Sequence, residues 1–144
     1  MKLTSFTPDF VRMLVDLRHA AAGMERAWRT LHEQDATLLQ ALVLREIVRE
    51  PGIRPFLLRQ RFGYEERRNR PIQQVQLRLV RARLIRAART DNCTRLAPTP
   101  AGIEAAARFE TSLRHIAETF WLDLAPEAAA AAAQALEQAR ERSP

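Results

Sequence analysis

The chain has 144 residues, 47% of them hydrophobic and 28% charged, with a net charge of +6, a pI of about 11.0 and a single cysteine. This length suits one domain with its own core, and no apolar run is long enough to cross a bilayer. The first residues lack the apolar stretch of a secretory signal, one cysteine cannot form an internal disulfide, and no Cys/His cluster has zinc spacing. We therefore expect a reduced, cytoplasmic protein without a cofactor, a metal or a membrane partner.

The first expected element is a long helix over residues 8–33. Thr7 supplies an N-cap, Pro8 a first-turn proline, and Asp9 an acid close to the positive end of the helix. Apolar residues then recur at alternating steps of four and three, which places them on one face of the helix. The members of this face are Phe10, Leu14, Leu17, Ala21, Met24, Trp28 and Leu31.

A compact segment interrupted by turn residues follows at 36–99. Its first helix begins after Asp35 and stops at Pro51 and Gly52, and a short second helix ends at Gly63. The residues of the first helix that we expect to face the core are Leu39, Leu42, Val43 and Ile47. A polar connection at 64–70 then leads to a third helix.

The third helix starts at Pro71 and has two distinct faces. Its inward side is expected to carry Ile72, Val75, Leu79 and Ala82. Its opposite side carries Arg70, Gln74, Leu77 and Arg81, with Gln73 and Arg78 on the shoulders. Arginine can bind guanine, and glutamine adenine, through two hydrogen bonds each, so this face suits base edges. Arginine and glutamine also occur on ordinary solvated helices, which is the alternative interpretation.

Residues 84–99 predict a basic β-hairpin. The segments LIRAAR and TRLAPT are two short strands, and Thr90–Cys93 is the turn, where Asp91 and Asn92 tolerate positive φ. A basic ribbon directly after a helix-turn-helix is a wing. Its tip would lie against phosphates or enter the minor groove, while the preceding helix enters the major groove.

Two more helices are expected at 100–142. Thr99 and Pro100 start the first, and Pro126 starts the second, which contains an alanine run. The apolar face of the first consists of Ile103, Ala106, Phe109, Leu113, Ile116 and Phe120. One small module cannot easily cover three apolar helices, so we expect a homodimer formed by 8–33 and 100–142; an ordinary monomeric core is the alternative. The expected dimer contacts are Phe10, Leu14, Leu17, Leu113, Ile116 and Phe120.

The positive charge is concentrated in the middle of the chain. Residues 45–95 contain fourteen arginines and five acidic residues, a net charge of +9, whereas 1–44 are neutral and 96–144 carry −3. An arginine-rich codon bias would spread the charge evenly. The uneven distribution instead favours a surface for a polyanion such as nucleic acid.

The order of a long helix, a winged helix-turn-helix and long C-terminal helices resembles the MarR family of bacterial transcription regulators over almost the whole chain. LVRARLIRAAR resembles the family's exit from the recognition helix, with Arg83 where glycine is usual, and REPGIRPFLLRQRFG resembles the helix before it. LAPTPAG resembles the end of the wing, with Thr99 and Gly102 matching and Pro98 where leucine is usual. The resemblance implies a mainly α fold in one domain, 1–144, with 36–99 as the DNA-binding module.

The resemblance also implies a function: a homodimeric repressor that binds a pseudo-palindromic operator in double-stranded DNA. Release by a small phenolic or aromatic molecule, or by oxidation, is common in the family. The expected DNA contacts are Arg67, Arg68, Arg70, Gln73, Gln74, Arg78, Arg89, Asn92 and Arg95.

One departure from the family favours an alternative function. The family's wing commonly carries Asp-x-Arg, but Asp91 is followed here by Asn92 and Cys93, so Arg89 or Arg95 would have to replace the missing arginine. The alternative is a protein-interaction module on a winged-helix scaffold that has lost specific DNA binding. An enzyme is not expected, because the sequence has no glycine-rich phosphate loop and no spaced nucleophile, base and orienting acid.

Overall fold

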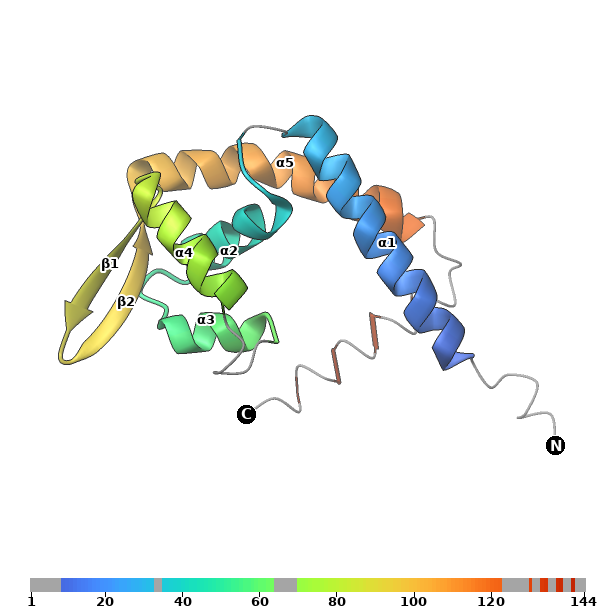
Figure 1. Ribbon diagram of the computed structural model, residues 1–144, viewed down its shortest axis with the longest axis horizontal. Helices are drawn as coiled ribbons and strands as arrows, with labels where there is room; N and C mark the ends of the chain where they lie inside the picture. Colours follow the sequence, from blue (N-terminus) through green and yellow to red (C-terminus); the bar gives the residue numbers. More distant parts are fainter. Residues whose placement is uncertain are drawn as a thin grey trace. The chain divides into compact units, whose positions relative to one another are not determined.

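The computed structural model describes residues 9–32, 35–63 and 70–122, together with 130, 133–134, 137–138 and 141, except for the side chains of Phe10, Met13, Trp121 and Leu122. Its elements are α1 (Phe10–Leu31), α2 (Leu38–Arg49), α3 (Pro55–Arg61), α4 (Arg70–Arg81), β1 (Ile85–Thr90), β2 (Cys93–Pro98) and α5 (Pro100–Leu122) (Figure 1). Five helices and one antiparallel hairpin in this order confirm the expected fold class. In the helix expected at 126–142, the separately described residues are helical.

The chain divides into two compact units, whose boundaries lie within α1 and α5. One unit is Trp28–Leu113, and the other combines Met1–Ala27 with Arg114–Pro144, so far as these are described. We call the first the winged-helix unit and the second the terminal unit. The segment expected as the DNA-binding module, 36–99, lies inside the winged-helix unit.

The core of the winged-helix unit is built from all of its short elements. α2 contacts α3, α4 and β2, while β1 contacts α4. The hairpin extends away from these helices (Figure 1). Side chains no more than 6% exposed line the core: Val43, Leu44, Ile47, Leu58, Ile72, Val75, Leu79, Ile85 and Leu96. Burial of each such side chain stabilises the fold by about 1.5–3 kcal/mol, so this core holds α4 and the base of the hairpin against α2.

The predicted inward face of α2 is partly wrong. Val43 and Ile47 are buried as expected, but Leu39 and Leu42 are only half-buried, and Leu44 is 0% exposed. The cause is that α2 touches three other elements of the unit. A helix enclosed on several sides buries more than one stripe, and a single apolar face no longer describes it.

The start of α1 also differs from the prediction. Asp9 Oδ1 accepts a hydrogen bond from the backbone N–H of Arg12 at 3.0 Å, and α1 begins at Phe10. Asp9 is therefore the capping residue, in the role expected of Thr7, because its carboxylate satisfies one of the free N–H groups of the first turn. Thr7 and Pro8 lie outside the described residues.

α4 ends in a Schellman motif. The backbone N–H of Leu84 donates to Leu79 O at 3.0 Å, and that of Arg83 donates to Val80 O at 3.0 Å. The motif needs a left-handed residue, and Arg83 supplies it with a φ of 59°. Glycine adopts this conformation without strain, so Arg83 occupies a position that suits glycine. Ala82, predicted to face inward, is exposed because α4 has already ended.

The beginning of α5 is joined to this helix end. The Thr99 N–H donates to Leu84 O at 3.0 Å, while its hydroxyl donates to Arg83 O at 2.6 Å and accepts from the Gly102 N–H at 3.0 Å. Gly102 is buried, and a Cβ there would overlap the Leu84 carbonyl oxygen and lie 2.9 Å from the carbonyl carbon. Only glycine permits this approach, which accounts for the threonine–glycine pair of the LAPTPAG motif.

The inward face of α5 starts from that contact. Gly102, Ala105, Ala106 and Phe109 are buried, whereas Ile103, predicted to be part of the apolar face, is 51% exposed. Because Gly102 points at the end of α4, residues three and four positions later also face inward, and Ile103 lies one step outside. The prediction for Ile103 is therefore wrong.

A buried aromatic cluster joins the end of α1 to α5 within the winged-helix unit. Trp28 is 0% exposed, stacks on His32 at a ring-centroid distance of 4.3 Å, and donates to Ala36 O at 2.8 Å. Phe109 meets the Trp28 ring edge-on at 5.5 Å. His32 Nε2 and Ser112 Oγ are hydrogen-bonded at 2.8 Å. These contacts are those of a packed core.

Candidate nucleic-acid interface

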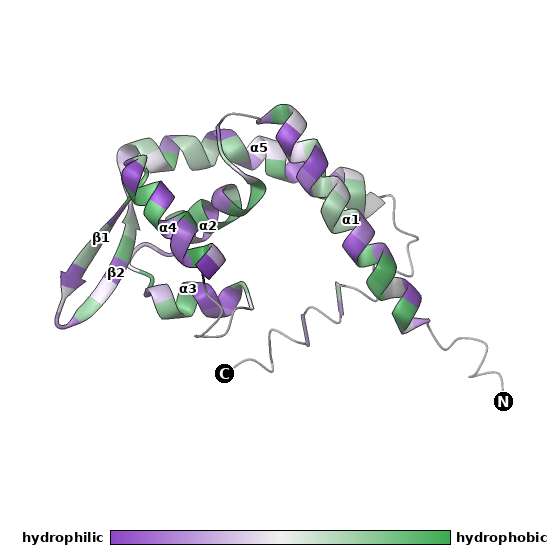
Figure 2. Cartoon of the chain, in the orientation of Figure 1, coloured by the Kyte–Doolittle hydropathy of each residue, from purple (hydrophilic) through white to green (hydrophobic). Residues whose placement is uncertain are grey.

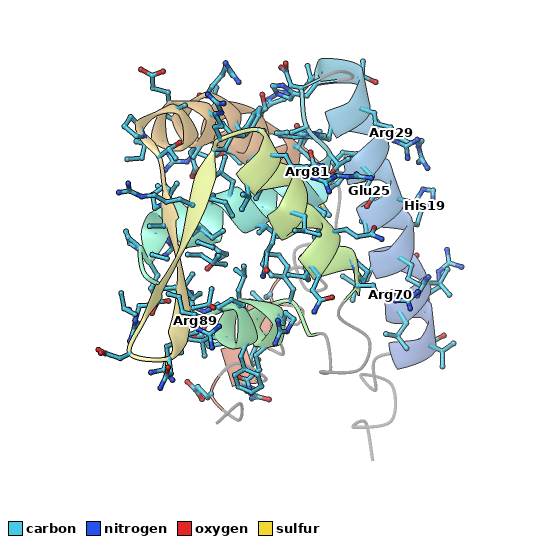
Figure 3. The ribbon with its side chains drawn as sticks, turned by 60° about the vertical axis from the view of Figure 1, so that its left-hand side comes forward. His19, Glu25, Arg29, Arg70, Arg81 and Arg89 are labelled. Atoms are coloured by element: carbon cyan, nitrogen blue, oxygen red, sulfur yellow. The ribbon has the colours of Figure 1, made fainter. Side chains whose placement is uncertain are left out.

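The outward face of α4 is the central feature of the candidate interface. Six residues spaced three, one, three, one and three positions apart are all exposed: Arg70, Gln73, Gln74, Leu77, Arg78 and Arg81. This spacing keeps them on one side of a helix, opposite the buried Ile72, Val75 and Leu79. Figure 3 shows Arg70 and Arg81 at the two ends of α4. The predicted inward and outward sides of this helix are thus confirmed for every position within it.

The electrostatics of α4 are one-sided. Its twelve residues contain no Asp or Glu. Within the part of the chain that the structure describes, its arginines form no ion pair. Figure 2 shows hydrophilic residues along α4 and β1. Residues 70–98 contain seven arginines and one aspartate, a net charge of +6 that equals the charge of the whole chain.

Three acidic residues of the winged-helix unit, Glu46, Glu50 and Glu110, are paired with arginines that lie outside α4 and the hairpin. Arg45 Nε lies 2.9 Å from Glu110 Oε2, and this hydrogen bond raises the pKa of Arg45. Arg61 bridges Glu46, at 3.2 Å, and Glu50. Arginines of α2 and α3 therefore hold the neighbouring helices together, and none of these described ion pairs involves an arginine of α4 or the hairpin.

The hairpin has the geometry expected of a wing. Asp91 and Asn92 have φ values of 51° and 63°, as a two-residue type I′ turn requires, and Thr90 pairs with Cys93 beside them. Both turn residues are exposed. The predicted turn is confirmed, and Asn92 lies at the tip.

The three arginines of the hairpin lie on its two faces. Arg95 is paired with Ala88, two positions after Arg86, which puts Arg86 and Arg95 on one face and Arg89 on the other. All three are exposed, and Figure 3 shows Arg89 on β1 towards the tip. Arg95 Nη1 donates to Gly52 O at 3.1 Å, so this guanidinium contacts the turn before α3. Arg86 was not among the predicted DNA contacts, although the alternation of side chains along the strand LIRAAR already predicted that it lies on one face of the hairpin.

The remaining predicted residues are two DNA contacts and the dimer contacts, and they differ in how exposed they are. Arg67 and Arg68 lie outside the described residues, as does the Phe10 side chain. Leu14 is 63% and Leu17 is 40% exposed on α1, whereas Ile116 is 3% exposed. Leu113 and Phe120 are half-buried. Among the described residues, no cluster of His, Cys, Asp and Glu could hold a metal ion, and no helix is long and apolar enough to span a membrane.

Three solved structures with the same fold are transcription regulators. PcaV from Streptomyces coelicolor, solved with its natural ligand, is 21% identical with a TM-score of 0.71 over 89% of this chain and 91% of PcaV. MepR from S. aureus, solved with DNA, is 16% identical with a TM-score of 0.70 over 87% and 93%. Reduced MarR from E. coli is 14% identical with a TM-score of 0.67 over 93% and 97%. No family model matches the sequence, and no curated protein matches it.

Proposed function

We propose that this chain is a cytoplasmic transcription regulator of the MarR type, not an enzyme, that binds a specific sequence in double-stranded DNA. The observation that carries the proposal is the outward face of α4, where exposed arginines and glutamines lie side by side without an acid. An α-helix fits the major groove, and these side chains match guanine and adenine edges. The fold shared with MepR, which was solved with DNA, supports this use of α4.

The proposed DNA contacts fall into two groups, those of α4 and those of the hairpin. Gln73, Gln74 and the α4 arginines Arg70 and Arg78 contact base edges. Arg89, Asn92 and Arg95, on the hairpin, contact phosphates or the minor groove. For Arg67 and Arg68, which precede α4 in the sequence, we propose phosphate contacts.

The regulator acts as a homodimer. α1 exposes a cluster of aliphatic side chains, Val11 at 71%, Leu14 at 63%, Val15 at 54% and Leu17 at 40%. Such a face on one helix is typical of a protein–protein interface. Phe10, Leu14 and Leu17 supply most of the contact, with Leu113 and Phe120 at its margin; Ile116 is already buried within the chain. Light scattering on the purified protein at micromolar concentration should give the mass of a dimer.

A twofold dimer matches a pseudo-palindromic operator, and we propose repression with release by a small aromatic molecule. The shared fold of PcaV, solved with its natural ligand, supports an effector. Displacement of the protein from its operator by candidate aromatic acids, measured by fluorescence anisotropy, tests this part. If none of these acids displaces the protein, the proposal of an aromatic effector is refuted, while the proposal of DNA binding is unaffected.

A gel-shift salt titration tests DNA binding itself. Affinity for duplex DNA should fall about a thousandfold or more between roughly 50 and 200 mM salt, because many phosphate contacts release counterions. Gln74→Ala should reduce the free energy by which the protein prefers operator over random duplex by about 1–3 kcal/mol. The matched control Gln60→Ala, at an exposed glutamine of α3, should leave this preference unchanged. Arg89→Ala should weaken both duplexes alike and lower the salt slope by about one; exposed Arg29→Ala is its control.

Two observations favour the second candidate function, a protein-interaction module. The wing lacks the Asp-x-Arg arginine, and Arg95 is bonded to Gly52 O. A shallow salt dependence together with equal, weak affinity for every duplex would select this alternative over a sequence-specific regulator.

A further inference from the structure

Leu77 is an apolar residue in a polar surface. It is 55% exposed, more than any other large hydrophobic residue described in the winged-helix unit. A single exposed leucine is ordinary on a protein surface. The position of Leu77 is not ordinary, because it lies about 60° around the helix from Gln74 and close to the line that joins Arg70 and Arg81. It is therefore central to the outward face of α4 rather than at its edge.

A leucine in this position has few acceptable partners in DNA. If Gln74 reaches a base edge, Leu77 is enclosed in the same major groove, since it is one turn further along the same face. Its side chain can neither donate nor accept a hydrogen bond. Every base pair presents donors or acceptors on the floor of the major groove, and only thymine adds an apolar methyl group, at C5. Facing any other edge, Leu77 would remove water from a polar group without replacing its hydrogen bond.

We propose that Leu77 recognises a thymine by packing on its C5 methyl group, next to the base pair that Gln74 contacts. Three residues of helix advance about 4.5 Å, close to the spacing of one base-pair step, so neighbouring base pairs are the ones in reach. Glutamine suits adenine and leucine suits thymine, so each half-site contains adjacent A·T pairs under the middle of α4. This inference rests on the proposed function and specifies what it recognises.

The test removes the methyl group without changing a hydrogen bond. Duplexes are enriched from a random library with the full chain, and each thymine of the enriched sequence is then replaced by deoxyuridine. Loss of one buried methyl contact should weaken binding about fourfold at one thymine in each half-site, and about sixteenfold when both half-sites are changed. Leu77→Ala should bind the thymine and deoxyuridine duplexes equally.

A matched control separates this contact from a general effect of the substitution. Leu57→Ala makes the same change at a leucine 37% exposed on α3, and this variant should retain the full thymine preference. Thermal unfolding of both variants checks that each is folded. Placing 5-methylcytosine instead of cytosine at the same position should strengthen binding of the wild type but not of Leu77→Ala.

Two failures are distinguishable. If no sequence is enriched over random DNA, the proposed function and this inference are both refuted. If an operator is enriched but no thymine in it responds to deoxyuridine, or Leu77→Ala responds as the wild type does, only the role of Leu77 is refuted.

Discussion

Replacing Gly102 by alanine tests how the wing is joined to α5. The new Cβ would overlap the Leu84 carbonyl oxygen and lie 2.9 Å from its carbonyl carbon and 3.4 Å from its Cα. The obstacle is backbone, which cannot rotate away as a side chain can. The Leu84 carbonyl also accepts the N–H of Thr99 at 3.0 Å, and therefore any movement of this carbonyl breaks the hydrogen bond that starts α5.

The expected cost follows from three contributions. Overpacking of a buried site costs about 1–3 kcal/mol. Displacement of Leu84 and Arg83 from Thr99 removes two hydrogen bonds, each contributing about 0.5–1.5 kcal/mol. Alanine recovers about 1 kcal/mol because it favours helix over glycine. The net effect is a loss of about 3 kcal/mol in the free energy of unfolding, or about 10 °C in Tm for a protein of this size.

Chemical denaturation of the purified variant measures this loss. The control is Ala101→Gly, an exposed neighbour in the same first turn, where only the helix propensity changes and the loss should be about 1 kcal/mol. A Gly102→Ala variant as stable as the wild type, or more stable, would show that α5 does not approach the Leu84 carbonyl as described, and the account of this junction would be wrong.

Three further substitutions have defined outcomes. Arg83→Gly should stabilise the protein by about 1 kcal/mol, because a residue with a Cβ is strained at a φ of 59°; a lower Tm would contradict the left-handed assignment. Thr37→Ala should cost about 1 kcal/mol, since Thr37 and Gln40 form a reciprocal capping box at α2, and Thr37→Ser, which keeps the hydroxyl, should cost much less. Arg45→Met should cost up to about 1 kcal/mol, a loss that disappears in a Glu110→Gln background if the partly exposed ion pair is its source.

Features set by local chemistry were predictable from the sequence. α4 has one buried side, so the period of Ile72, Val75 and Leu79 was enough to identify its outward face. The turn of the hairpin was predictable because Asp91 and Asn92 are residue types that accept positive φ.

Features set by tertiary context were not predictable in this way. Leu44 is in the core because α2 is enclosed by several elements, which no single period reveals. Arg83 is not a residue type that signals a left-handed helix end, and the hydrogen bonds of the Schellman motif decide its conformation. The hydrogen bond from Arg95 to the carbonyl of Gly52, 43 positions earlier in the chain, was also not predicted, and the DNA contact expected of Arg95 stays a prediction. A partner this far away in the chain cannot be predicted from the residues next to Arg95 in the sequence.

The β-bridge between Ile53 and Leu96 fixes the base of the hairpin to the rest of the winged-helix unit and leaves the length of the hairpin unconstrained. The Leu96 N–H donates to Ile53 O at 2.9 Å, and Leu96 O accepts from the Gly52 N–H at 2.7 Å. Ile85 and Leu96 are the buried residues of the two strands, both near the base of the hairpin. The ribbon beyond them can therefore change in length without altering the core. Each residue added to both strands extends the tip by about 3.3 Å, and additions in pairs keep every side chain on its original face. Evolution or design can thus adjust how far the wing extends from the winged-helix unit while α4 keeps its place.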